Sequence, residues 1–288
     1  MGPLPVIVGF DQKPTSEQGP HVITYHASLD VPDETLSQVC RWLQTHRDHQ
    51  DIRPWQRAAT VFVQAVMVLR WFKNHDDMRI LAHDARISIA TGYRYLHEAI
   101  DVIGVHAPTL QEVLDKAIAE DWPFVCLDGT LVPTDRIAAI NPDTGNDLWY
   151  SGKHKQHGAN VQVLQDPTGY PEWVSPAEPG STHDITAART HALPALYKAA
   201  AHGLKTLTDK GYTGAGAGIM VPTKGHHLDP DTKTRNKLIA GLRAPAERSN
   251  ALLKETFKAL RHVTLDPSCI TNIVAAALVL LHLQRPNR

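Results

Sequence analysis

Three acidic residues hold positions in which carboxylates commonly do chemistry. Asp128 ends an apolar run in VCLDGT, Asp209 ends another in LTDKGY, and Glu247 falls within RAPAERSNALLK. The two apolar runs have the composition of buried strands, and α/β sheets place ligand sites at strand ends. Carboxylates brought together from separate elements repel one another unless a cation or a proton lies between them. Taken singly, each of the three also fits a turn or surface carboxylate.

Converging carboxylates are a suitable site for a hard divalent cation. Mg²⁺ takes oxygen ligands and is bound by a few carboxylates together with substrate phosphates. Two such ions about 4 Å apart can activate a water and stabilise the leaving oxygen of a phosphoryl transfer. If Asp128, Asp209 and Glu247 converge, we therefore expect metal-dependent chemistry on a phosphodiester.

Charged residues recur along one face of the helix expected around Glu247. Arg243, Glu247 and Lys254 are separated by four and seven residues, which places all three on that face. Lys258 and Arg261 are expected to extend it. An ordinary i,i+4 salt bridge on a surface helix has the same pattern. The other interpretation is a metal carboxylate beside bound phosphates.

A neighbouring apolar stripe is expected to hold this helix against the sheet. The stripe consists of Leu242, Ala246, Leu253, Phe257 and Leu260. Pro245 lies two residues before Glu247, and proline inside a helix removes a hydrogen bond at a cost of about 3 kcal/mol or more. We therefore expect the helix either to restart near Pro245 or to kink there.

These segments resemble the DDE transposases of bacterial insertion sequences, in the insertion-sequence-five group related to eukaryotic Harbinger elements. The matching pieces are LDGT, GSTHD at 180–184, TDKGY and RAPAERSNALLK, in the order that the family has them, and the resemblance covers about residues 55–285. It implies an RNase H-like fold and Mg²⁺-dependent strand cleavage and transfer at transposon ends, with Mn²⁺ expected to substitute. It also implies that double-stranded DNA, at transposon ends and target, is the partner.

The same resemblance assigns roles to individual residues. It makes Asp128, Asp209 and Glu247 the catalytic and metal-binding triad. Asp184 matches an additional family aspartate and is a further candidate metal ligand. Because two transposon ends must be brought together, the resemblance also implies a homo-oligomer, at least a dimer on DNA.

Basic residues near the C-terminus provide a candidate surface for that DNA. The whole chain has a net charge of -1, yet residues 201–288 carry 13 Lys and Arg against six Asp and Glu. A basic third within a neutral protein suggests a polyanion patch, although an ordinary solvated surface accounts for it equally well. By resemblance Lys254 touches phosphate at the transposon end, and we expect Arg243 and Lys258 to contact DNA as well.

Upstream, helices are expected over 32–47, 54–74 and 77–83, followed by one that Ser88 can cap. An apolar stripe runs along the last helix: Ile89, Tyr93, Leu96, Ile100 and Ile103. Thr91 and Arg94 lie off the stripe near its start. Helices joined by tight turns in this way resemble a helix-turn-helix DNA reader, with Thr91 and Arg94 as DNA contacts. A plain helical bundle is the alternative.

The pattern changes after residue 121. Strands are expected at 122–134, as a pair within 158–180, and near 204–212 and 218–224. Helices are expected over 183–201, 236–263 and 270–284. Strands that alternate with helices indicate a mixed α/β sheet.

Together with the resemblance, this pattern predicts an α/β fold class in three parts. A loose N-terminal arm covers 1–30, an all-α helix-turn-helix domain covers 31–118, and an RNase H-like mixed sheet flanked by helices covers 119–288.

Several classes of protein are disfavoured. Cys40, Cys126 and Cys269 are few and far apart, which argues against a disulfide scaffold or a cysteine zinc site and fits a reducing compartment. The start of the chain lacks the pattern of a signal peptide. The longest apolar run, 273–283, has 11 residues, too few to span a bilayer. We expect a cytoplasmic, nucleoid-associated bacterial protein with no membrane partner.

Three other functions are considered. FVCLDGTLVPT also resembles the first motif of haloacid-dehalogenase-type phosphatases, but Cys126 stands where their nucleophilic aspartate would be. A non-catalytic helix-turn-helix regulator with an α/β ligand domain leaves TDKGY and the charged helix face unexplained. A domesticated or inactive, transposase-derived DNA-binding protein is the main alternative, and a requirement for divalent metal separates it from the enzyme.

Overall fold

The computed structural model describes residues 6–7, 28–142 and 145–285, with the side chains of 6, 7, 28 and 247–250 left outside the description. The chain divides into two compact units, Met1–Val102 with His282–Arg288, and Ile103–Leu281. Most of the expected arm, 1–30, lies outside the described residues. Within it, β1 (Val6–Ile7) pairs antiparallel with β2 (Ser28–Leu29).

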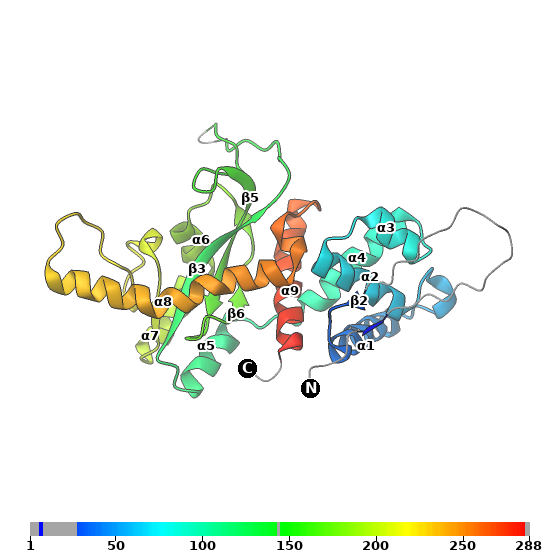
Figure 1. Cartoon of the computed structure of the whole chain (residues 1–288), viewed down its shortest axis with the longest axis horizontal. Coiled ribbons are helices and arrows are strands. Elements are labelled where there is room, and N and C mark those ends of the chain that lie inside the picture. Colours follow the sequence, from blue (N-terminus) through cyan, green and yellow to red (C-terminus); the bar gives the residue numbers. More distant parts are fainter. Residues whose placement is uncertain (1–5, 8–27, 143–144, 286–288) are drawn as a thin grey trace. The chain divides into compact units, whose positions relative to one another are not determined.

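The first unit is helical (Figure 1). Its helices are α1 (Asp33–His49), α2 (Val61–Asn74), α3 (Met78–Asp84) and α4 (Ile89–Gly104), the last of which runs across the unit boundary. The expectation that α2 begins at Pro54 is wrong. Pro54–Gln56 forms a separate 3-10 turn, and α2 begins after Thr60, whose hydroxyl accepts a hydrogen bond from the Val63 N–H.

The apolar stripe expected on α4 is partly wrong. Ile89 and Tyr93 are exposed, because they lie in the first turns of α4, outside the hydrophobic core that covers the rest of the stripe. Tyr95 is buried instead, although it lies off the stripe. Its hydroxyl accepts the Ala58 N–H at 2.9 Å, and the Arg57 guanidinium lies 5.2 Å from its ring centre.

The second unit is built on a mixed sheet. Its strands are β3 (Phe124–Pro133), β4 (Tyr150–Ser151), β5 (Gln156–Gln165), β6 (Pro171–Val174), β7 (Glu178–Pro179), β8 (Lys205–Leu207) and β9 (Ile219–Met220). The order is β4-β5-β3-β8-β9, with β6 and β7 also paired to β5. β5 runs antiparallel to β3 and β6, whereas β8 is parallel to both β3 and β9. The expected mixed α/β architecture is therefore confirmed.

Helices cover the sheet. They are α5 (Leu110–Ala119), α6 (Asp184–His191), α7 (Leu193–Ala201), α8 (Pro230–Thr256) and α9 (Ile270–Gln284). The chain expected as one helix over 183–201 is two, because the helix breaks at Ala192 and restarts with a proline in the first turn of α7. α5 has no counterpart among the predicted elements, and it groups with the sheet rather than with the helices that precede it.

The two faces of β3 pack against different helices. Leu127 belongs to the large core that includes residues of α5, α6 and α7, whereas Cys126 packs with Leu207 and with Ala246 of α8. Figure 1 shows α8 crossing the strands on this second face. Because successive strand residues point to opposite faces, Asp128 lies on the same face as Cys126, the face that α8 covers.

α8 differs from the helix expected over 236–263. It begins after Asp229, whose carboxylate caps it, and ends at Thr256. Lys258–Arg261 forms a 3-10 turn, so Lys258 and Arg261 do not extend the helical face. Leu242 of the expected apolar stripe is exposed, whereas the rest of that stripe is buried.

Pro245 lies inside α8 without a restart of the helix. The hydrogen bond that it removes would join its own nitrogen to the carbonyl of Gly241, which is exposed and therefore open to water. Gly169, in the turn between β5 and β6, lies directly against it: a β-carbon there would be 2.2 Å from the Pro245 carbonyl oxygen. Gly169 also has a φ of +83°, so this turn requires glycine twice over.

One stretch of the described chain is long and apolar enough to cross a membrane. Residues Pro267–Gln284, an 18-residue window of mean hydropathy 1.5, include α9 and are longer than the apolar run considered above. Half of this window is buried within the protein. The core helix of a soluble protein has the same length and composition, so the finding is weak support for a membrane span.

Candidate active site

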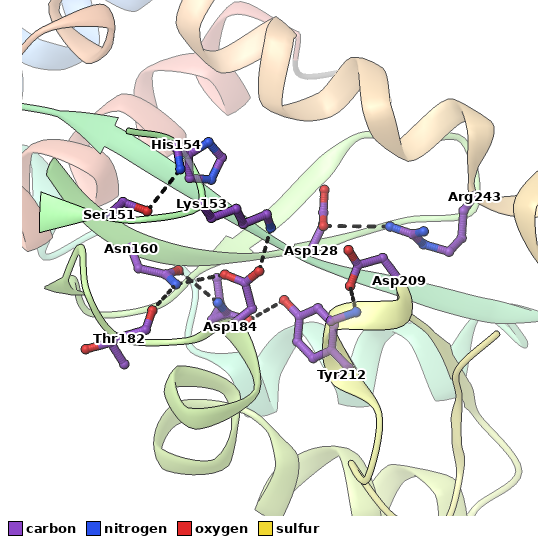
Figure 2. A network of polar contacts seen from close by, with 12 residues as sticks. Asp128, Ser151, Lys153, His154, Asn160, Thr182, Asp184, Asp209, Tyr212 and Arg243 are labelled. Atoms are coloured by element: carbon purple, nitrogen blue, oxygen red, sulfur yellow. Dashed lines mark hydrogen bonds and ion pairs between the residues drawn. The ribbon is translucent and has the colours of Figure 1, made fainter. Parts of the chain in front are cut away.

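Asp128 and Asp209 belong to neighbouring parallel segments of the sheet. Asp128 lies in the middle of β3, not at the strand end expected from the sequence, because β3 continues to Pro133, whereas Asp209 follows the end of β8. Cys126 of β3 is in register with Leu207 of β8. Asp128 comes two residues after Cys126, and Asp209 comes two residues after Leu207. Because adjacent strands are about 4.8 Å apart, this register brings the two backbones to the same level of the sheet. Figure 2 shows both carboxylates in the same region, with Arg243 reaching toward Asp128.

Burial and like charges act on the Asp128 carboxyl group. Its side chain is 21% exposed, and one of its oxygens lies 3.7 Å from the Arg243 guanidinium. Burial, together with the charges of Asp209 and Asp184, raises the pKa of Asp128 to about 6, against the opposing effect of Arg243 and Lys153. A further negative charge beside Asp128 is therefore unfavourable unless a cation compensates it, which is the electrostatic property expected of a carboxylate metal site.

Asp184 approaches from the first turn of α6. Its Oδ2 accepts a hydrogen bond from Lys153 Nζ at 2.8 Å, and its Oδ1 accepts one from Asn160 Nδ2 at 2.8 Å. A β-carbon at Gly129 would lie 2.3 Å from Oδ1, so the absence of a side chain directly after Asp128 is what admits Asp184. The glycine of LDGT is a sequence signal for the close position of Asp184 that the motif comparison alone does not reveal.

A chain of buried hydrogen bonds joins Asp184 to the turn that follows Asp209. The Tyr212 hydroxyl donates to Gln162 Oε1 at 2.6 Å, and Gln162 Nε2 donates to Asn160 Oδ1 at 3.0 Å. Asn160 completes the chain to Asp184. All three residues are buried, so each polar group needs its neighbour. Polar residues at alternate positions of the apolar strand β5 could have indicated this relay.

The same turn orients Asp209. Its carboxylate accepts the Gly211 N–H at 2.8 Å and caps the 3-10 turn Lys210–Tyr212. Tyr212 is fully buried, and burial raises the pKa of its hydroxyl well above the ordinary value, so it stays a hydrogen-bond donor. Asp209 and Asp184 are therefore positioned through one connected structure.

Two side chains of α8, those of Arg243 and Lys254, make polar contacts with β3. Arg243 lies beside Asp128, as described, and its buried Nε has no hydrogen-bond partner among the described residues. Lys254 Nζ donates to Thr130 Oγ1 at 2.9 Å and to the Leu131 carbonyl at 2.8 Å, and burial lowers its pKa. The expected shared face of Arg243 and Lys254 therefore faces the sheet. Glu247 lies between them in sequence, in helical backbone, but its side chain is outside the described residues.

The other predicted DNA contacts lie elsewhere. Arg94 is exposed on α4, where its guanidinium donates to the Thr91 hydroxyl at 3.2 Å. Ser88 Oγ accepts the Thr91 N–H at 3.2 Å, so Thr91 stands in the first turn of a capped helix. Lys258 is exposed in the 3-10 turn after α8.

The donor chemistry of the site fits a hard divalent cation. Asp209 and Asp184 lie near enough to Asp128 for their charges to raise its pKa, and a bound cation would offset that effect. Within the described residues, no group of three or more His, Cys, Asp or Glu is arranged to hold a metal ion. Lys153 and Arg243 instead supply positive charge beside Asp184 and Asp128.

A mixed α/β fold with aspartates on one strand and directly after its parallel neighbour is compatible with a DDE nuclease. The family described as DDE superfamily endonuclease matches residues 127–282, more than half of the chain, and the chain belongs to this family. The match begins one residue before Asp128. No curated protein matches the chain significantly. Membership makes a transposase-like nuclease activity on DNA, dependent on divalent metal, the activity class of this chain.

Proposed function

We propose that the chain is a DNA transposase, which binds transposon-end DNA and performs strand cleavage and transfer by a two-metal mechanism. The pairing of Cys126 with Leu207 carries the proposal, because Asp128 and Asp209 each follow two residues later, at one level of the sheet. Asp184, which lies against Gly129, is a third carboxylate whose charge acts on Asp128. We further propose that the fold is RNase H-like, and that the relatives are the insertion-sequence-five group and the Harbinger elements.

Asp128, Asp209 and Glu247 would hold Mg²⁺, with Asp184 as an additional ligand and Mn²⁺ as a substitute. When bound, the metal supplies an activated water and stabilises the leaving oxygen. Support for Glu247 comes from its neighbours: Ala246 packs on Cys126 and Leu207, the residues two positions before the two aspartates. The helix backbone at this point therefore lies over the carboxylates.

The protein's own residues hold this arrangement. Lys254 ties α8 to β3 through Thr130, and the Tyr212 relay fixes Asp184 relative to Asp209. Effective phosphoryl transfer depends on such fixed geometry, since most of the catalysis is positioning and charge compensation.

We propose that α3, the turn after it and α4 read DNA as a helix-turn-helix, with Thr91 and Arg94 as contacts. The exposure of Arg94 at the start of a capped helix supports this role. Lys258 is proposed as a phosphate contact. Arg243 and Lys254 contact β3 in this structure, so a role in DNA binding would require them to exchange partners. We also propose that the chain acts as a homo-oligomer, at least a dimer on DNA, and that it is associated with the nucleoid in the bacterial cytoplasm.

A second candidate is an inactive, transposase-derived DNA-binding protein. The observation that favours it is the pairing of Asp128 and Asp184 with the protein's own cations, Arg243 and Lys153. Such a protein would bind DNA without any need for divalent metal.

One experiment separates the two candidates. Gel-shift and cleavage are measured on the same labelled duplex, taken from inverted repeats flanking the gene, while Mg²⁺ or Mn²⁺ is titrated after chelation. The transposase cleaves the duplex only when the metal is restored. Binding that persists with no cleavage at any metal concentration would identify the inactive protein.

A further inference from the structure

Lys153 lies at the boundary between the carboxylates and a cavity. It belongs to the short connection from β4 to β5, and its ammonium group pairs with Asp184 at 2.8 Å. Figure 2 shows its side chain extended toward the aspartates. The cavity beside it has a volume of about 190 Å³ and is lined by Lys153, His154, Ser181, His183 and Asp184, among others.

The two cations at the carboxylates differ in freedom of movement. The Arg243 side chain is 12% exposed, so its place beside Asp128 is enclosed by protein. The Lys153 side chain is 58% exposed, while its partner Asp184 is 13% exposed. A lysine has a flexible four-carbon stem and three rotatable donors, and the exposed side of this ion pair is the lysine. Lys153 can therefore leave Asp184, which keeps Asn160 as a hydrogen-bond partner.

The cavity suits a phosphodiester. Its volume is below the range of about 300–1,000 Å³ that drug-sized ligands occupy, so it has room for a phosphate group rather than for a whole cofactor. Lys153, His154 and His183 bring cationic or hydrogen-bonding nitrogens to its walls. The lining also includes the acidic residue Asp184, whose charge a bound metal ion would neutralise.

We propose that Lys153 is a switchable phosphate ligand. It neutralises Asp184 in the metal-free protein and turns to a phosphodiester of bound DNA in the adjacent cavity once a divalent cation occupies the carboxylates. This inference rests on the proposed function, and it couples the two ligands: metal binding frees the lysine that then holds DNA. Metal-free protein would in turn hold DNA with one phosphate contact fewer.

The test compares Lys153→Met with Lys155→Met in the full chain. Lys155 is exposed two residues further on and makes no ion pair with any described residue, so it is a matched control. Mn²⁺ binding is measured by calorimetry without DNA. Lys153→Met loses the ion pair that competes with a metal ion for Asp184, so this variant should bind Mn²⁺ roughly two- to fivefold more tightly than the wild type. Lys155→Met should match the wild type.

The second readout is the salt dependence of duplex binding, with and without Mg²⁺. In the wild type and in Lys155→Met, Mg²⁺ should steepen the slope of log affinity against log salt by about 0.9, the value of one phosphate contact. In Lys153→Met that increment should disappear. Equal Mn²⁺ affinity and an equal Mg²⁺ increment in all three proteins, with metal-dependent cleavage intact, would overturn this inference alone. A wild type that binds no divalent metal would overturn the proposed function and the inference with it.

Discussion

Asp184 and Gly129 are in contact on one face of the central strand β3, at a distance that leaves no room for even one additional carbon atom. A β-carbon at position 129 would meet both Oδ1 and Cγ of Asp184, the latter at 2.7 Å. The glycine after Asp128 is therefore what allows Asp184 to lie against β3, on the strand face opposite to the Asp128 side chain.

Gly129→Ala should displace Asp184 and abolish metal-dependent cleavage. Overpacking of this kind typically costs about 1–3 kcal/mol, so the variant should still fold. Cleavage and the unfolding midpoint in urea are measured side by side with Gly241→Ala, since Gly241 is exposed and a β-carbon there would meet no atom within 4 Å. Normal cleavage by Gly129→Ala would show that Asp184 has no part in the reaction.

Asp128→Asn should abolish cleavage and yet stabilise the metal-free protein at pH 8. The pKa of Asp128, about 6, lies above the ordinary 3.8, so the folded chain retains a proton that the unfolded chain releases between these values. The free energy of unfolding therefore falls as pH rises from about 4 to about 6, and stays lower above that range. Removing the charge should recover about 1–3 kcal/mol at pH 8 and nothing at pH 4.

Urea unfolding at the two pH values provides that measurement, with Asp115→Asn as the control. Asp115 is exposed on α5 and is a hydrogen-bond partner of Gln111, so its amide variant should show no such pH-dependent gain. Loss of the partner of Arg243 acts against the gain in Asp128→Asn. A variant that is less stable at pH 8 than at pH 4, relative to the wild type, would contradict the prediction.

Tyr212→Phe should weaken metal binding and cleavage more than DNA binding. The change leaves the Gln162 carbonyl buried without its donor, at a cost of about 1–3 kcal/mol, and loosens the connection from Asp209 to Asp184. The control is Tyr197→Phe, which removes a hydroxyl that donates to the Ala215 carbonyl, away from the carboxylates. If the two variants lose stability equally and both retain wild-type Mn²⁺ affinity, the relay has a structural role only.

Lys254→Met tests whether this lysine holds the fold or contacts DNA. Its ammonium group donates twice to β3, so we expect a lower unfolding midpoint and reduced cleavage. The salt slope of duplex binding should stay the same if both donors remain with Thr130 and Leu131 in the complex. A slope shallower by about 0.9 would instead show that Lys254 contacts a phosphate, as the family resemblance implies.

Arg94→Ala should weaken binding to transposon-end DNA. A contact to a base edge contributes about 1–3 kcal/mol, so the affinity should fall by roughly five- to 150-fold. Arg41→Ala is the control, because Arg41 is also an exposed helical arginine, with a hydrogen bond to Gln38 in its own helix. Unchanged affinity together with unchanged sequence preference would move DNA recognition away from α4.

The two strands that bring Asp128 and Asp209 to one level of the sheet follow from sequence, although Asp128 lies inside its strand and not at its end. Asp128 and Asp209 end apolar runs, and those runs become the parallel neighbours β3 and β8 because buried parallel strands are continuously apolar. α9 and the β5–β6 hairpin were also confirmed within their expected segments.

What the sequence did not indicate depends on contacts between distant segments. Lys153 reaches Asp184 across 31 residues, and Lys254 reaches Thr130 across 124, and no local pattern encodes either pair. The end of α8 was misplaced for a related reason. Phe257 has the right spacing to continue the helical stripe, but it takes an extended backbone and is buried there instead.

The contact between Gly169 and the backbone of Pro245 has an evolutionary consequence. A hairpin that gained a residue, or a side chain in place of Gly169, would push against the helix that carries Glu247, at Pro245 and Ala246 directly before it. A relative with a longer hairpin should therefore lose metal-dependent cleavage even when its aspartates are intact, so the spacing between β5 and β6 constrains the sequence as the acidic residues themselves do.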